Sequence, residues 1–84
     1  MVHITIDTAT REEAEKLASS LPGQPAATSV RGYGLIRTRC RSEREVSNLL
    51  VAVDDVVRRH SLSWARVRRG DEEHMFRGSV SRAS

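Results

Sequence analysis

Two kinds of hydrophobic spacing alternate along this chain, and their order constrains its fold more than any other feature. Val2, Ile4 and Ile6 alternate with polar residues, a pattern typical of a short strand with one buried face. The segment Thr10-Arg-Glu-Glu13 has the sequence of a capping box, which begins a helix and places acidic residues in its first turn. The apolar stripe of this helix is Ala14, Leu17, Ala18 and Leu21.

The segment from residue 26 to residue 40 is too long for one ordinary strand and contains two glycines. It follows Pro22-Gly23, which is expected to end the first helix. We therefore predict a hairpin with strands over residues 26–31 and 34–40 and a turn around Gly32-Tyr33. The alternative is a single long second strand in a smaller, three-stranded sheet, and the two glycines argue against it.

The second half of the chain repeats this alternation of helix and strand signals. Ser42-Glu-Arg-Glu45 is a second capping box, and the helix after it ends with basic residues at 58–60, which suit a helix C-terminus. Residues 63–69 are predicted as a strand, Gly70-Asp71 as a tight turn and residues 73–77 as a short last strand. The apolar face of this second helix is Val46, Leu49, Leu50, Val53 and Val57.

This order of elements predicts an α+β fold of the ferredoxin-like βαββαβ type, an antiparallel sheet with two helices on one face. The residues after Gly70 can add an extra C-terminal hairpin strand. With 84 residues, the chain is expected to form a single α+β domain over residues 1–77, followed by a flexible tail over residues 78–84. A domain of this size with three aromatic residues has a lean core, so we expect a homodimer.

Composition also bears on the compartment. The N-terminal segment lacks the apolar stretch of a signal peptide, and no window reaches the length of a membrane span. Cys40 is the only cysteine, which excludes an internal disulfide and favours a reducing compartment. We therefore expect a cytoplasmic protein without a membrane partner.

Period-two alternation assigns the strand residues to two faces of the predicted sheet. Acidic residues fall mainly on the predicted helices, so a net charge of +3 can conceal a strongly basic sheet face. The residues expected to face the helices are Val2, Ile4, Ile6, Val30, Ile36, Thr38, Cys40, Ala65 and Val67. Those expected on the opposite, open face are His3, Thr5, Leu35, Arg37, Arg39, Trp64, Arg66 and Arg68.

Arginines on an open sheet face indicate an anionic partner. Such faces bind single-stranded nucleic acid when aromatic side chains lie between the basic ones, because guanidinium groups contact phosphates while rings stack on bases. We hypothesise a non-enzymatic binding module, with RNA or single-stranded DNA as its leading candidate partner. The expected nucleic-acid-binding residues are Arg31, Tyr33, Arg37, Arg39, Trp64, Arg66 and Arg68.

Residues 31–38, RGYGLIRT, resemble the third-strand signature of the RNA recognition motif. That signature reads basic, Gly, aromatic, Gly or Ala, aromatic, aliphatic, any residue, aromatic. The first four residues and the aliphatic sixth residue match it, whereas Leu35 and Thr38 stand where aromatic residues are expected. His3 also takes the place of a first-strand aromatic residue. The resemblance implies a βαββαβ domain that binds RNA on its sheet, with fewer rings for base stacking.

A second resemblance is to the small ligand-sensing domains that follow DNA-binding domains in feast/famine regulators. It rests on Leu21-Pro-Gly23, on the Gly32-Tyr-Gly34 turn and on the long apolar helix after that hairpin. This family shares the ferredoxin-like fold and dimerises through it. The acidic residue that the family carries after the turn glycine is absent here.

The alternative function is a dimerisation or regulatory protein-interaction domain whose open sheet face is the subunit interface. Leu35, Trp64 and a residue of the last strand, Met75 or Phe76, are apolar groups that a second copy would cover. Arginines buried in such an interface would need carboxylate partners, since an unpaired buried charge is costly. The acidic residues at 71–73 could supply them.

Residues that could support catalysis or metal binding do not form a recognisable set. The three histidines, His3, His60 and His74, show no ligand spacing with one another or with Cys40, which is expected to point inward. The glycine pair at 32 and 34 lacks the third glycine of a dinucleotide-binding loop. We therefore expect no catalytic residue, no metal and no cofactor.

Overall fold

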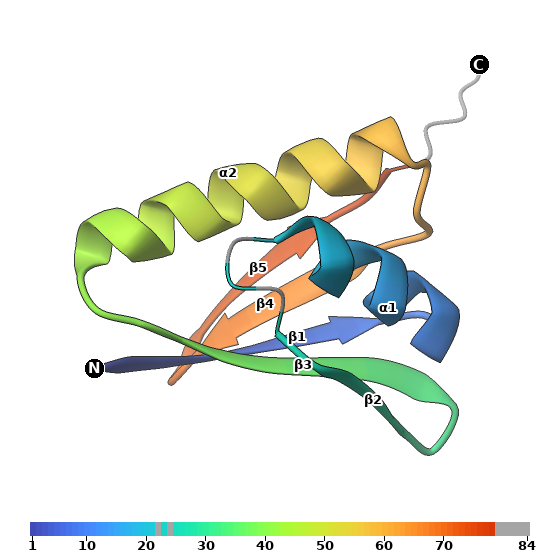
Figure 1. The fold of residues 1–84 in the computed structure, drawn as a ribbon, viewed down its shortest axis with the longest axis horizontal. Helices are drawn as coiled ribbons and strands as arrows, with labels where there is room; N and C mark the ends of the chain where they lie inside the picture. The colour runs from blue at the N-terminus through green and yellow to red at the C-terminus, as the bar shows by residue number, and fades with distance from the viewer. Residues whose placement is uncertain (22, 24, 79–84) are drawn as a thin grey trace.

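The computed structural model describes residues 1–21, 23 and 25–78 (Figure 1). Pro22, expected to help end the first helix, and residues 79–84 of the expected tail lie outside this part of the chain. The elements are strand β1 (Val2–Thr8), helix α1 (Arg11–Ser20), strands β2 (Ala27–Val30) and β3 (Tyr33–Cys40), helix α2 (Glu43–Arg59), and strands β4 (Ala65–Arg69) and β5 (Glu72–Phe76).

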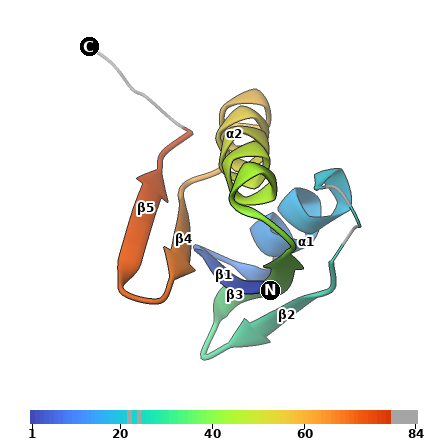
Figure 2. The ribbon, with the colours of Figure 1, turned by 90° about the vertical axis from the view of Figure 1, so that its left-hand side faces the viewer.

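The strands form one antiparallel sheet in the order β2-β3-β1-β4-β5. Both helices pack on the same side of it, as the two views in Figures 1 and 2 agree. The predicted α+β class is confirmed. The hairpin of β2 and β3 is present, so the alternative of one long second strand is wrong. The extra C-terminal hairpin strand is present as β5.

The core lies between the helices and one face of the sheet. Burial alternates along β1 and β3 as the period of two predicts, and the predicted apolar stripes of both helices face this layer. The buried apolar residues are Ile4, Ile6, Ala14, Leu17, Ala18, Leu21, Ile36, Cys40, Val46, Leu49, Val53, Val56, Val57, Leu62, Ala65 and Val67.

One face assignment is wrong. Val30, which we expected to face the helices, is 49% exposed and lies directly opposite Tyr33 in the β2–β3 register. Cross-strand partners share a face, so Val30 lies with Tyr33 on the side away from the helices. The reason is the turn: it consists of Arg31 and Gly32, and not of Gly32 and Tyr33.

Both central residues of this turn have positive φ, 53° for Arg31 and 86° for Gly32, which is characteristic of the type I′ hairpin turn. Gly34 is already a strand residue, and its role is packing. A Cβ at this position would lie 2.1 Å from Oγ1 of Thr8 and 2.3 Å from the carbonyl oxygen of Thr10. The two glycines of the RGYG segment therefore serve different purposes, one in the turn and one against the start of α1.

Both predicted capping boxes supply the N-cap hydrogen bond. Thr10 Oγ1 accepts from the N–H of Glu13 at 3.1 Å, and Ser42 Oγ accepts from the N–H of Glu45 at 3.3 Å. The Glu13 carboxylate accepts hydrogen bonds from the N–H and Oγ of Ser63 in the loop before β4. Helix α1 is thereby joined to the loop before β4, the strand that carries Arg66 and Arg68.

Candidate functional site

The sheet face opposite the helices, called the open face below, is organised in rows of cross-strand neighbours. One row runs Leu35, Asp7, Arg66 and Met75 across β3, β1, β4 and β5. The next row runs Arg37, Thr5, Arg68 and Glu73 across the same strands. Because directly opposed residues lie about 5 Å apart, these rows bring arginines from separate parts of the chain together.

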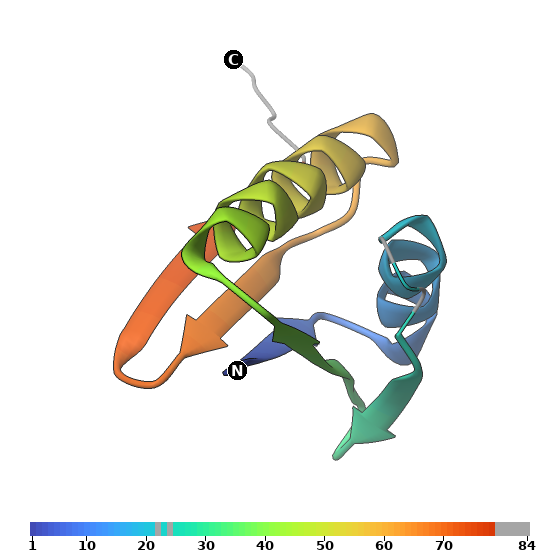
Figure 3. The same cartoon turned by 60° about the vertical axis from the view of Figure 1, so that its left-hand side comes forward.

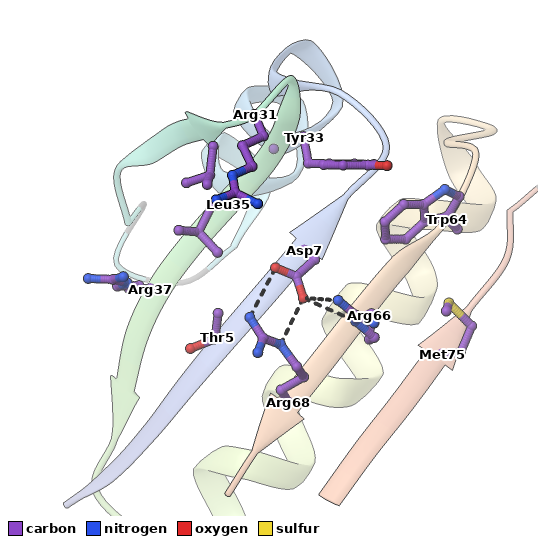
Figure 4. A pocket seen from close by; sticks show the side chains of 12 residues that line it. Thr5, Asp7, Arg31, Tyr33, Leu35, Arg37, Trp64, Arg66, Arg68 and Met75 are labelled. Carbon is purple, nitrogen blue, oxygen red and sulfur yellow. Dashed lines mark hydrogen bonds and ion pairs between the residues drawn. The ribbon is translucent and has the colours of Figure 1, made fainter. Parts of the chain in front are cut away.

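A hollow of about 720 Å³, called the open-face hollow below, lies over these strands (Figure 4). Its volume is within the range of small-molecule sites. It combines an apolar and aromatic part with an arginine-lined part. Its lining residues are Thr5, Asp7, Val30, Arg31, Tyr33, Gly34, Leu35, Arg37, Trp64, Arg66, Arg68 and Met75.

Six of the seven residues predicted as the binding site line the open-face hollow, and one does not. Arg39 lies two residues farther along β3, at a smaller depression of about 260 Å³ that it shares with His3, Thr5 and Arg37. Arg37 borders both depressions. The arginines therefore form a track along β3 that leads into the open-face hollow.

Asp7 is the site residue that the sequence analysis missed. Its carboxylate lies between the guanidinium groups of Arg66 and Arg68, with Oδ2 3.0 Å from Arg66 Nη2 and 2.8 Å from Arg68 Nε (Figure 4). Arg68 Nη2 also donates to Oδ1 at 3.2 Å. The Asp7 side chain is 13% exposed, against 38% for Arg66 and 41% for Arg68. The alternation that placed Thr5 on this face extends to Asp7 and could have identified it.

Asp7 changes the electrostatics of the site. It compensates one of the two charges carried by Arg66 and Arg68, and it holds both guanidinium groups in place. Within the part of the chain that the structure describes, Arg31, Arg37 and Arg39 make no ion pair. The four arginines and one aspartate that line the open-face hollow give it a net charge of +3. The strongest uncompensated charge is thus on the β2–β3 side.

Two aromatic rings meet at the apolar part of the open-face hollow. Tyr33, 56% exposed, and the half-buried Trp64 have ring centroids 6.5 Å apart at an interplanar angle of 51°. This separation is typical of tilted aromatic pairs. The rings come from the start of β3 and the residue before β4, so the pair joins two strands that are not neighbours in the sheet.

Among the described residues, three groups outside the open-face hollow have shifted pKa values. Burial raises the pKa of the Cys40 thiol, which suits a core residue and not a nucleophile. The hydrogen bond from Arg69 lowers the pKa of Glu43, and the same interaction raises the pKa of Arg69. Arg69 thereby pairs the end of β4 with the first turn of α2 and is not available to the open face.

No group of three metal-binding side chains comes together within the described residues. None of the helices described is both long enough and apolar enough to cross a membrane. No family model, curated protein or solved structure matches this chain.

Proposed function

We propose that the fold is ferredoxin-like with one added strand, β5. The order β2-β3-β1-β4 supports this, because each helix connects two strands that are separated by one other strand. In such a domain the helices cover one face of the sheet, so a binding site can form on the other face.

On that face, we propose a non-enzymatic binding module for an anionic partner, with single-stranded RNA or DNA as the ligand. The observation that carries this proposal is the exposed Tyr33 ring, in contact with Trp64 and beside Arg31 and Arg37 in one hollow. A base can stack on the ring while the phosphates follow the arginines along β3 toward Arg39. Arg66 and Arg68, held by Asp7, then supply the floor of the site.

The affinity for a short oligonucleotide should fall steeply with salt concentration. Replacing Arg37 and Arg39 together by alanine should reduce the slope of log affinity against log salt by about 0.7 for each phosphate that is no longer neutralised. Fluorescence of Trp64, the single tryptophan, provides the measurement. The matched control is Arg58→Ala/Arg59→Ala, which removes the same charge from the exposed end of α2. Equal slopes for both double variants, or no binding by the wild type at low salt, would contradict the proposal.

Replacing Arg31 by asparagine should have opposite effects on folding stability and on oligonucleotide binding. Its φ of 53° is unfavourable for arginine, whereas Asn-Gly is the preferred sequence of a type I′ turn. Arg31→Asn should therefore raise the free energy of unfolding by about 1 kcal/mol and weaken oligonucleotide binding. Urea unfolding and the fluorescence titration measure the two effects.

Ser61→Asn is the control for Arg31→Asn. Ser61 also has a positive φ, 52°, but it lies after α2 and away from the open face. The Ser61→Asn variant should gain a similar amount of stability, and its oligonucleotide binding should be unchanged. Unaltered affinity of the Arg31→Asn variant would remove Arg31 from the proposed site.

A face-to-face homodimer is the second candidate for the open face. Tyr33, Val30 and Met75 are among the large apolar residues that are most exposed, and all three line the open-face hollow. A second copy could cover them, and Trp64→Ala would then lower the oligomer mass. A lower oligomer mass for Trp64→Ala is therefore one of the outcomes of the experiment that tests dimerisation through β5.

A further inference from the structure

Strand β5 forms one end of the sheet, and its outer edge is uncovered in the part of the chain that the structure describes (Figures 2 and 3). An edge strand presents unpaired backbone N–H and C=O groups and can pair with another strand. The opposite edge strand, β2, has four residues, whereas β5 has five and is followed by the exposed Arg77. The β5 edge is therefore the longer of the two.

The β4–β5 turn determines which β5 residues direct their backbone groups outward. Gly70 and Asp71 form a two-residue loop, so Arg69 and Glu72 are the first hydrogen-bonded pair of the ladder. Antiparallel pairs alternate between hydrogen-bonded and non-hydrogen-bonded. Glu73 and Met75 belong to the second kind, so their N–H and C=O groups point away from β4. Arg77 continues this series.

The side chains of these three residues also share a face. Glu73 and Met75 lie opposite Arg68 and Arg66 on the open face. Phe76 packs against the core, and a Cβ on Gly78 would lie 2.2 Å from the carbonyl oxygen of Val57 in α2. Arg77, between two residues that face α2, therefore points to the side of Met75. Glu73 and Arg77 are exposed and make no ion pair with any described residue.

We propose that β5 pairs antiparallel with β5 of a second copy of this chain, with the two-fold axis at Met75. In this register Glu73 lies opposite Arg77 of the other copy, and Arg77 lies opposite its Glu73. The outward backbone groups at 73, 75 and 77 then all enter hydrogen-bonded pairs. An axis at Glu73 would instead place two like charges directly opposite each other, which is unfavourable. Charge complementarity therefore selects both the partner and the register.

Pairing at this edge joins the two sheets into one continuous ten-stranded sheet and leaves both helical layers on the same side. The two open faces become a single surface with both sets of arginines on it. This dimer differs from the face-to-face alternative, which would bury those arginines. It stands independently of what the open face binds.

A charge-exchange experiment tests the pairing. Glu73→Arg places two arginines opposite each other at both ends of the paired strands, and Arg77→Glu places two glutamates there. Each variant alone should therefore self-associate about tenfold or more weakly than the wild type. An equimolar mixture of the two variants restores an opposite-charge pair at each end in place of the like-charge pairs only if the two β5 strands pair in this register.

In the mixed dimer, the arginine introduced at position 73 of one variant faces the glutamate introduced at position 77 of the other variant. At the other end, Arg77 of the first variant faces Glu73 of the second. Both ends of the heterodimer therefore carry opposite charges, and the mixture should associate about as strongly as the wild type. The double variant Glu73→Arg/Arg77→Glu exchanges the two charges within each copy and also restores both opposite-charge pairs. It should regain the self-association of the wild type. Sedimentation equilibrium over a concentration series gives the masses, and circular dichroism checks that each variant remains folded.

Two further variants separate this interface from its alternatives. Met75→Pro removes the central outward N–H, is tolerated at a sheet edge, and should abolish the dimer while the protein stays folded. Trp64→Ala should leave the dimer intact. A monomeric wild type, a double variant that does not associate, or a dimer lost only in the Trp64→Ala variant would overturn the proposal.

Discussion

Replacing Gly34 by alanine should destabilise this protein more than the same replacement at the turn glycines Gly32 and Gly70. The new Cβ would lie 2.1 Å from Thr8 Oγ1, 2.3 Å from the Thr10 carbonyl oxygen and 2.6 Å from Ala14 Cβ. Thr8 is fully buried, and the Thr10 oxygen also accepts the first helical hydrogen bond of α1 from Ala14 N–H. Relief of the clash therefore requires β3 to move away from α1.

We expect a loss of about 3 kcal/mol or more in the free energy of unfolding for Gly34→Ala. This is a large share of the total, because a chain of 84 residues has about 4–13 kcal/mol in all. Urea unfolding followed by Trp64 fluorescence measures the loss. Gly32→Ala is the control: it has open space around the added methyl and a φ of 86°, so it should cost about 1–2 kcal/mol. An unfolding midpoint for Gly34→Ala at or above that of Gly32→Ala would contradict the packing role.

Asp7→Asn should have the second largest effect, and it should act oppositely on stability and on anion binding. The substitution keeps the shape of the side chain but leaves Arg66 and Arg68 without their common counter-charge. Loss of one member of a fully buried ion pair costs about 3–5 kcal/mol. Here the two guanidinium groups are about two-fifths exposed and can be hydrated, so we expect about 2 kcal/mol.

The same change raises the net charge lining the open-face hollow from +3 to +4, and anion affinity at low salt should rise accordingly. Chemical unfolding gives the first effect and the oligonucleotide titration gives the second. Asp54→Asn is the matched control, because Asp54 pairs with Arg58 on the exposed surface of α2 and its loss should change stability by less than about 1 kcal/mol. If Asp7→Asn behaved like Asp54→Asn in both measurements, Asp7 would not organise the site.

The RGYG segment illustrates how far a local pattern can be interpreted. The presence of a hairpin was predictable, since two glycines in a strand-like segment favour a turn. The predicted position of the turn was wrong by one residue, because Arg31 adopts a positive φ that its residue type disfavours, and Tyr33 belongs to the strand. The close approach of Gly34 to Thr10 exists only after α1 has packed on β3, and the sequence near residue 34 carries no signal for it.

The order of the elements, the α+β class, both capping boxes and nearly all of the buried face could be predicted from the amino-acid sequence. These follow from side-chain spacing and from caps within a few residues, which are properties of a short segment. The folded chain was needed to show that Asp7 lies between Arg66 and Arg68, residues 59 and 61 positions away, and that Arg39 lies outside the open-face hollow. The position of β5 at the end of the sheet, with an uncovered edge, also became known only from the fold. Such features depend on strand order and register, which bring distant residues together only when the whole sheet forms.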